Sequence, residues 1–421
     1  MNNLQIGSSV GDEIIDRLNA AGYDAYYVGG CVRNALLGIE IKDWDIASSA
    51  KPDEVKALFD DLKIVETGLK HGTVTIISDM PYEVTTFRKE GKYSDFRHPD
   101  RVYFCESIIE DLARRDFTCN AIAFSKNKGI IDVFGGIYDT HNHILRSVGI
   151  ATTRFKEDSL RILRGIRFSS ELGFVIEDKT FAAMIKTKTL IGNVSRERIY
   201  AELKRIFDGQ YFYNAVINCR EILSESLNTE LPAENYSNAV LSSSKCKGDF
   251  YTKFTVFLYI EYEKNLSAIK EILVNLRCEK KLKKTLEQCL SCMEILSSKL
   301  FLFSGENSYG ENNYSIEKKY IAKKILNECE GSPSDFLSFL DAIDIKDFSS
   351  DELKIVIKKV LSNNECYAVN QLAITGADIA LNGFTGHRIS KALNNVLDCV
   401  MSEKITNEKE RLLDYVRSLK L

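Results

Sequence analysis

The hydrophobic pattern of the first 146 residues mixes short apolar runs with amphipathic segments. Apolar positions at helical spacing predict a helix over residues 12–21, which ends before Gly22. Further elements are predicted in this order: a buried strand at 25–30, a helix at 31–38, a strand at 43–50, a helix at 51–59, strands at 72–78, 82–87 and 101–105, and a polar loop at 88–100. Residues 1–146 are therefore predicted to form one α/β domain with a small mixed sheet.

After Leu145 the pattern becomes helical and stays so. One long helix is predicted over residues 154–174, and another over 195–207 with Ser195 as its N-cap. Polar loops at 242–249 and 304–315 interrupt an otherwise helical pattern. The predicted fold class is an α/β N-terminal domain followed by an all-α remainder.

The composition excludes two classes of protein. The 421 residues are 44% hydrophobic and 28% charged, which is typical of globular chains, and the length favours more than one domain. No apolar run reaches the ~18 residues of a membrane span, and the first residues lack the basic and apolar segments of a signal peptide. We therefore expect neither a membrane-spanning nor a secreted protein.

The cysteines point to a reducing compartment. There are 11 of them, scattered along the chain and odd in number, as expected of free thiols in the cytoplasm. Cys289 and Cys292 form a Cys-x-x-Cys pair in a helical pattern, without a second Cys pair or a nearby His. We interpret them as core residues rather than as a zinc or redox site.

The distribution of charge matters more than its sum. The whole chain carries a net charge of −4, but residues 146–206 contain 13 Lys and Arg against 7 Asp and Glu. Such a basic segment can form a local phosphate-binding surface. A solvated charged helix face is the alternative that charge alone leaves open.

Paired glycines mark the junction between the first predicted strand and the helix after it. Gly29 and Gly30 let the backbone approach a ligand, and the helix N-terminus offers free N–H groups to an anion. Arg33, three residues on, carries a guanidinium that can fork onto phosphate oxygens. The pair is weak evidence alone, so its meaning depends on the acidic residues that follow.

Asp43 and Asp45 lie two residues apart in the next predicted strand, so their carboxylates share one face. Carboxylates so placed repel each other unless a cation lies between them, and Mg²⁺ with a triphosphate fits this arrangement. Glu83, in the predicted strand 82–87, can add a third carboxylate from a neighbouring strand. The alternative is a coincidental Asp-x-Asp at a strand end.

A second cluster combines Arg114 and Arg115 with Asp116 and Asn120. The guanidinium groups can bind phosphate, and the Asp and Asn side chains can accept hydrogen bonds from ribose hydroxyls. In isolation the same motif also fits a helix end with surface ion pairs.

The third cluster belongs to the long predicted helix, where Arg161, Arg164 and Arg167 recur at every third position. Cytosine and adenine both present an amino donor beside a ring-nitrogen acceptor. Asp158 accepting from the amino group and Arg161 donating to the ring nitrogen suit both bases and refuse guanine and uracil. One helix can thus select C and A without a nucleic-acid template. An ordinary surface pair between Glu157 and Arg161 is the alternative.

Five ordered motifs together resemble the bacterial class II tRNA nucleotidyltransferases, the CCA-adding enzymes, and their poly(A) polymerase relatives. The motifs are GGCVRNALLG, DWDIA, RRDFTCNAIA, DVFGG and RFKEDSLRILRGIRF, which span the chain from residue 28 to about residue 170. A weaker likeness, in ITGADIALNGFTG and TNEKERLLDYV, extends to the tail of the same family. The ordered set is specific although each motif alone is weak.

The resemblance implies a head (1–146), a neck (147–209) that recognises the base, and a body (210–365) and a tail (366–421) that bind tRNA. It implies addition of C and A to the 3′ end of tRNA from CTP and ATP, by two-metal nucleotidyl transfer that releases pyrophosphate. We further expect a cytoplasmic protein, either a monomer or a homodimer, with no membrane partner.

The same resemblance assigns roles to individual residues. Asp43 and Asp45 would bind Mg²⁺ and, with Glu83, form the catalytic set. The nucleotide-binding set would comprise Gly29, Gly30, Arg33, Arg115, Asp116, Asn120, Glu157, Asp158, Arg161, Arg164 and Arg167. Two positions depart from the family pattern: Asn34 replaces the usual Asp, and Trp44 is bulky but is expected on the opposite face of its strand.

The resemblance leaves the product open. The loop at 88–100, with Tyr93, Asp95 and Arg97, favours a capacity to add A, because CC-only enzymes lack the full loop. A-adding enzymes and poly(A) polymerases stay as alternatives. None of the five His is directly followed by an Asp, so we expect no phosphohydrolase activity of the kind that depends on His-Asp pairs. His71 is interpreted as structural.

Two alternatives come from other classes of protein. A non-catalytic RNA-binding protein on the same fold is disfavoured, because the metal-binding and base-reading residues are all present. A small-molecule nucleotidyltransferase shares the glycine pair and the Asp-x-Asp motif. It is disfavoured because it has no use for the basic segment or the long helical remainder.

Overall fold

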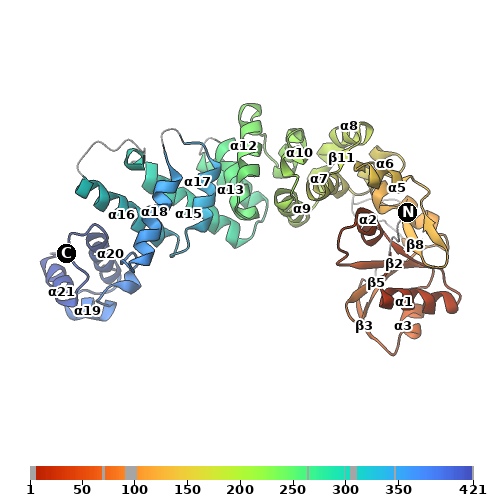
Figure 1. Ribbon diagram of the computed structural model, residues 1–421, viewed down its shortest axis with the longest axis horizontal. Coiled ribbons are helices and arrows are strands. Elements are labelled where there is room, and N and C mark those ends of the chain that lie inside the picture. The colour runs from red at the N-terminus through yellow and green to blue at the C-terminus, as the bar shows by residue number, and fades with distance from the viewer. Residues whose placement is uncertain are drawn as a thin grey trace. The chain divides into compact units, whose positions relative to one another are not determined.

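The computed structural model describes residues 6–68, 72–90, 102–262, 265–297, 299–303, 311–345 and 348–419. The chain forms two compact units (Figure 1). The first comprises Met1–Tyr236 with Val274–Arg277, and the second comprises Ser237–Leu273 with Cys278–Leu421. Within the described part of the chain, no helix combines the length and the apolar character that crossing a membrane takes.

A seven-stranded mixed sheet organises the N-terminal part of the first unit, as predicted (Figure 1). The strand order is β3-β4-β5-β2-β1-β8-β9, in which β2 and β5 run parallel and the other neighbours are antiparallel. The strands are β1 (Ala25–Val28), β2 (Trp44–Ser48), β3 (Lys63–Gly68), β4 (Thr73–Ile77), β5 (Pro81–Thr86), β8 (Ala123–Ser125) and β9 (Gly129–Ile131). The pattern predicts β1, β2, β4 and β5 but not the sheet-edge strand β3 or the short strands β8 and β9.

Short helices accompany this sheet: α1 (Ser9–Ala20), α2 (Gly30–Leu37), α3 (Pro52–Leu58), α4 (Ile108–Ala113) and α5 (Gly136–His141), with a 3-10 turn η2 (Thr118–Asn120). Helix α1 starts earlier than predicted, because the hydroxyl of Ser8 accepts the N–H of Gly11 at 3.0 Å and caps the helix. Trp44 belongs to the hydrophobic core that α1 shares with the sheet, and its ring centroid lies 5.1 Å from that of Tyr27. The prediction that Trp44 faces away from its acidic neighbours is thereby confirmed.

One correction concerns the loop predicted at 88–100. Its first residues form strand β6 (Arg88–Glu90), which pairs antiparallel with β7 (Val102–Phe104). Strand pairing overrides the polar composition there, since each residue from 88 to 90 has a partner on β7. Tyr93, Asp95, Arg97 and His71 lie outside the described residues, so the expectations placed on them stay predictions.

Helices make up most of the rest of the first unit: α6 (Ala151–Glu157), α7 (Leu160–Leu172), α8 (Asp178–Thr187), α9 (Arg196–Asp208), α10 (Phe212–Val216) and α11 (Arg220–Leu227). A two-stranded parallel pair, β10 (Ile144–Leu145) with β11 (Val175–Ile176), accompanies them. Ser195 stands at the N-cap position of α9, but its side chain makes no capping hydrogen bond.

The single helix predicted over 154–174 is wrong, because the chain breaks between α6 and α7. Asp158 adopts an extended conformation, with φ −136° and ψ 106°. Its Oδ1 accepts the N–H of Leu160 at 3.1 Å, which caps the start of α7. The break turns the Asp158 side chain from a helix-face position into a cap.

The second unit is helical. Helix α12 (Ala233–Lys245) leads into it, followed by α13 (Phe250–Glu261), α14 (Leu266–Asn275), α15 (Lys280–Ser297), α16 (Glu311–Glu328), α17 (Ser334–Ala342), α18 (Ser350–Ser362), α19 (Gly376–Leu381), α20 (His387–Met401) and α21 (Lys409–Ser418). Cys289 and Cys292 are buried in its larger core, which confirms the structural interpretation of that pair. The loop predicted at 242–249 begins only after Lys245, because the buried Ser243 keeps the last turn of α12 in place by donating to the carbonyl of Lys253. The loop predicted at 304–315 is wrong over residues 311–315, where α16 begins, and residues 304–310 lie outside the described part of the chain.

A close backbone contact fixes α5 against η2. The carboxylate of Asp132 accepts the N–H groups of Gly136 and Ile137 at 2.8 and 2.9 Å. A Cβ atom at position 136 would lie 2.1 Å from the carbonyl oxygen of Thr118, so only glycine fits. The contact holds η2 in place, and η2 carries Asn120.

Gly136→Ala is expected to lower the free energy of unfolding by about 1–3 kcal/mol, because the added methyl group forces the packed backbones apart. The measurement is the thermal unfolding midpoint of the purified variant. Gly192→Ala, in the 3-10 turn η3 (Lys188–Asn193), is the matched control, since a Cβ there meets nothing within 4 Å. Equal midpoints for the two variants would contradict the contact.

Candidate functional site

A polar cavity of about 730 Å³ lies within the first unit. Among the described residues, nine arginines and three aspartates line it, together with the turn between β1 and α2. The charged lining consists of Arg33, Arg88, Arg114, Arg115, Arg161, Arg164, Arg167, Arg198, Arg205, Asp45, Asp116 and Asp158. This surplus of positive charge suits a polyanionic ligand.

The structure brings most of the predicted site residues to this cavity. Its lining includes Gly29, Gly30, Arg33, Asp45, Arg115, Asp116, Asn120, Asp158, Arg161, Arg164 and Arg167. Asp43, Glu83 and Glu157 are not part of the lining but lie next to residues that are. Residues from three separate predicted clusters therefore share one site.

The glycine turn allows side chain and backbone to meet closely. Gly29 has a positive φ of 70°, and a Cβ there would lie 2.7 Å from Nη1 of Arg115. Helix α2 begins at Gly30, so its first N–H groups open toward the same cavity. The turn thus combines N–H donors with an adjacent guanidinium group.

Arg33 is buried and held by two neutral oxygens. Its Nε and Nη2 donate to Oδ1 of Asn34 at 3.2 and 2.9 Å, and its Nη1 donates to Oδ1 of Asn120. Burial lowers the pKa of Arg33. Asn34, the departure from the family pattern, therefore keeps the contact that orients Arg33 and adds no negative charge beside it.

Asp45 lines the cavity, and two further carboxylates are close enough to influence it electrostatically. Asp45 on β2 lies directly beside Glu83 on the parallel neighbour β5, and Asp43 precedes β2 by one residue. The pKa of Asp45 is raised to about 6, mainly by burial and in part by Glu83 and Asp43, while Arg115 acts in the opposite direction. Mutual repulsion among these carboxylates is the electrostatic condition that a bound cation relieves.

The donor set fits a hard divalent cation, since all three side chains offer carboxylate oxygens. In the described part of the chain, no three His, Cys, Asp or Glu side chains already converge as a formed metal site. The register of β2 with β5 places Glu83 next to Asp45. Metal binding by Asp43, Asp45 and Glu83 stays a prediction.

Asp111 is a central residue of the site that the sequence analysis missed. Its buried carboxylate on α4 accepts from Arg114 at 2.7 Å and from Arg115 at 3.2 Å. Burial would raise the pKa of Asp111, but the two guanidinium groups hold it below its usual value. The signal was available, because Asp111 lies three and four residues before the two arginines.

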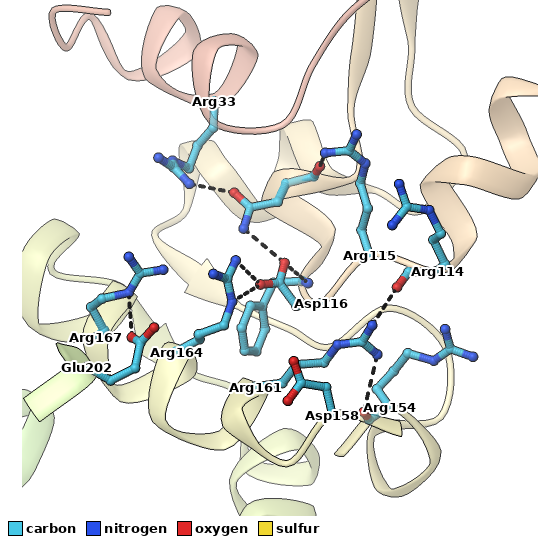
Figure 2. Close-up of polar contacts among 12 residues, drawn as sticks. Arg33, Arg114, Arg115, Asp116, Arg154, Asp158, Arg161, Arg164, Arg167 and Glu202 are labelled. Atoms are coloured by element: carbon cyan, nitrogen blue, oxygen red, sulfur yellow. Dashed lines mark hydrogen bonds and ion pairs between the residues drawn. The ribbon is translucent and has the colours of Figure 1, made fainter. Parts of the chain in front are cut away.

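Asp116 links the second cluster to α7. Its Oδ2 accepts from Nε and Nη2 of Arg164 at 2.8 and 2.6 Å, and its Oδ1 accepts from Asn120 at 3.1 Å (Figure 2). Although burial acts in the opposite direction, Arg164 and Asn120 hold the pKa of Asp116 well below its usual range. Asp116, Asn120 and Arg33 therefore form one continuous hydrogen-bonded chain across the site.

Asp158 and Arg161, predicted to read the base together, each have an ion-pair partner in the structure, and that of Arg161 is the Glu157 named above as the alternative. Asp158 pairs with Arg198 on α9 at 3.0 Å, and Arg161 pairs with Glu157 at 2.8 Å. Arg161 also donates to the backbone carbonyl of Arg114 at 3.0 Å, as Figure 2 shows. Arg198 was missed because nothing local in the sequence indicates that α9 packs along α7.

The remaining arginine of the predicted row also has a partner on α9. Nε of Arg167 lies 2.9 Å from the Glu202 carboxylate (Figure 2). Burial lowers the pKa of Arg167 to about 10 and raises that of Glu202. Helices α7 and α9 thus face each other through ion pairs that border the cavity.

Comparison with known proteins gives two matches to family models. Residues 25–146 match the model described as the poly A polymerase head domain. Residues 173–221 match the one described as a probable RNA and SrmB binding site of polymerase A. The first range contains the glycine turn, the carboxylates and Asp116.

Similarity to curated and solved proteins covers nearly the whole chain. The CCA-adding enzyme of Lactiplantibacillus plantarum is 32% identical over 96% of this chain and 94% of its own length, and that of Streptococcus mutans is 33% identical over 96% and 95%. The crystal structure of the Bacillus stearothermophilus CCA-adding enzyme with CTP superposes with a TM-score of 0.76 at 27% identity, over 97% of this chain and 96% of that one. The Thermotoga maritima CCA-adding enzyme complexed with tRNA shares the fold, with a TM-score of 0.66 at 19% identity over 97% and 94% of the two chains. The chain therefore belongs to the CCA-adding enzyme family of tRNA nucleotidyltransferases.

Proposed function

We propose that this protein adds C and A to the 3′ end of tRNA, without a nucleic-acid template, from CTP and ATP with release of pyrophosphate. The observation that carries the proposal is the single cavity in which arginines from three sequence clusters surround the glycine turn next to the Asp45 and Glu83 carboxylates. A polyphosphate beside a carboxylate edge is what nucleotidyl transfer needs. The Bacillus stearothermophilus complex with CTP and the Thermotoga maritima complex with tRNA support the same substrates.

The phosphate-binding part of the proposed mechanism rests on the glycine turn and its neighbours. N–H groups at the start of α2, with Gly29 and Gly30, would bind the triphosphate together with Arg33. Arg115 and Arg164 would neutralise further phosphate charge, while Asp116 and Asn120 keep them in place and face the sugar. These groups are already oriented by their own hydrogen bonds, so little ordering is left for substrate binding.

Asp43, Asp45 and Glu83 would hold Mg²⁺. A bound Mg²⁺ supplies Lewis-acid stabilisation to the reacting phosphoryl oxygens and favours deprotonation of the attacking hydroxyl. The register of β2 with β5 places Asp45 beside Glu83. A tRNA 3′-hydroxyl would attack next to these carboxylates, with the helical regions 147–209 and 210–421 recognising the base and the tRNA respectively.

Incubation with Mg²⁺ and defined tRNAs tests the proposal. The tRNAs end before the first C, after one C and after CC, and each nucleotide is supplied alone and then CTP with ATP. Completion of CCA on the shortest tRNA, followed by a stop, is expected. Addition of A only to the CC end would mean an A-adding enzyme, long A tails would mean a poly(A) polymerase, and no incorporation would contradict the proposal.

Asp45→Asn tests the metal site in the same assay, because an amide binds Mg²⁺ far more weakly than a carboxylate does. We expect its rate of incorporation to fall by roughly a thousandfold, as loss of several kcal/mol of metal-assisted stabilisation implies. Asp60→Asn, at an exposed position on the same unit, is the control and should keep full activity. Normal incorporation by Asp45→Asn would mean that the metal site is misassigned.

A separate variant tests base selection. A carboxylate only accepts hydrogen bonds, whereas an amide also donates, so Asp158→Asn should admit uracil and guanine. We expect the preference for CTP over UTP, measured as the ratio of kcat/KM, to fall by at least about tenfold. The amide oxygen can still accept the N–H of Leu160, so the cap of α7 is preserved.

Glu171→Gln is the matched control for this measurement. Glu171 is an acidic residue on α7, and its partner Arg205 also borders the cavity. Selectivity in this variant should match that of the unmodified protein. An unchanged ratio in Asp158→Asn, or an equal change in Glu171→Gln, would count against Asp158 as a base-reading residue.

A further inference from the structure

Three guanidinium groups of the cavity surround one aromatic ring. The Cζ atom of Arg167 lies 4.4 Å from the centroid of the Phe168 ring, that of Arg33 5.2 Å and that of Arg164 5.4 Å. Arg33 comes from α2, whereas the other two arginines and Phe168 belong to α7. The ring therefore lies where two distant parts of the sequence meet, at the wall of the cavity.

The ring of Phe168 packs against a second aromatic ring. Phe168 is only 6% exposed, and its ring contacts the fully buried ring of Phe117 edge-on, with a centroid separation of 5.9 Å and an interplanar angle of 84°. Phe117 directly follows Asp116 in the sequence. The ring is thus part of the packed framework and can define where the guanidinium groups stand.

The three guanidinium groups repel one another inside a partly buried site, so an attractive group between them stabilises their arrangement. Arg164 and Arg167 each have one carboxylate partner, Asp116 and Glu202, whereas Arg33 has the neutral oxygens of Asn34 and Asn120. Burial lowers the pKa of both Arg33 and Arg167, as expected of desolvated cations. The negative face of an aromatic ring attracts a guanidinium group without removing its charge.

We propose that Phe168 is a positioning residue that holds Arg33, Arg164 and Arg167 together so that they bind the polyphosphate of the incoming nucleotide. A carboxylate in its place would hold the arginines equally close but would cancel charge that the phosphates require. The inference rests on the proposed function and assigns a determinant of nucleotide affinity that does not depend on the base. It predicts equal effects on CTP and ATP and no effect on a ligand that lacks phosphate.

The test measures binding by calorimetry with Mg²⁺ present, using CTP, ATP, inorganic tripolyphosphate and cytidine as probes. Phe168→Leu keeps an apolar side chain but removes the ring, so it should weaken binding of the three phosphate ligands by about tenfold. Phe168→Tyr keeps the ring face and should bind them within about twofold of the unmodified protein. Binding of cytidine should be the same in all variants.

Phe174→Leu is the matched control for the loss of a buried aromatic ring. Phe174 directly follows α7, is fully buried and meets His143 rather than an arginine cluster. It should lower the unfolding midpoint while leaving tripolyphosphate affinity unchanged. If Phe168→Leu does not fold, Phe168→Met takes its place, because it retains a long apolar side chain.

The outcomes separate this inference from the proposed function. Unchanged tripolyphosphate binding in Phe168→Leu, an equal loss in Phe174→Leu, or no tripolyphosphate binding by the unmodified protein would overturn the role of Phe168. None of these readouts needs tRNA or turnover. A failure of CCA addition with intact, Phe168-dependent polyphosphate binding would instead overturn only the proposed reaction.

Discussion

The site depends on one buried carboxylate, that of Asp116. It accepts hydrogen bonds from Arg164 on α7 and from Asn120, which in turn accepts one from Arg33 at the start of α2. Removing a carboxylate from water costs several kcal/mol unless hydrogen-bonded cations surround it. Asp116 meets this condition only when α7 lies against the strand-rich part of the first unit. Satisfying a single charge therefore brings the glycine turn and the arginine row to the same cavity.

Positive charge in the cavity is kept in excess by the choice of acceptors. Asn34, Asn120 and backbone carbonyls orient several of the guanidinium groups, so part of the hydrogen-bonding capacity is met without negative charge. Carboxylates hold other arginines of the site: Asp111 pairs with Arg114, and Asp116 pairs with Arg164. The chain as a whole is slightly acidic, with a net charge of −4. Local placement, and not total charge, thus creates an attractive field for a nucleotide.

Local signals in the sequence predict the elements that carry the site, but not how its side chains pair. Alternation over residues 43–50 indicates the strand that carries Asp45, and the glycine pair indicates the turn at α2, because both signals are local. The break at Asp158 was not predicted, since its capping hydrogen bond competes with a helix pattern that is strong on either side. Pairing of Asp158 with Arg198 depends on the packing of α9 along α7, which no spacing within either helix specifies. Asp111 was the one avoidable omission, because its distance from Arg114 and Arg115 is a helical one.

The pairings of Asp158 and Arg161 have a consequence for how a base would be chosen. Each group already has an internal partner, Arg198 for the first and Glu157 for the second. A base read by Asp158 and Arg161, as proposed, would have to replace these ion pairs, and it would gain only the difference in free energy between the two sets of interactions. A wrong base would leave both ion pairs intact, so its rejection would leave neither Asp158 nor Arg161 without a partner. In such a site the unliganded state has no unpaired charge at Asp158 or Arg161. A mismatched nucleotide could therefore dissociate without any rearrangement of these ion pairs.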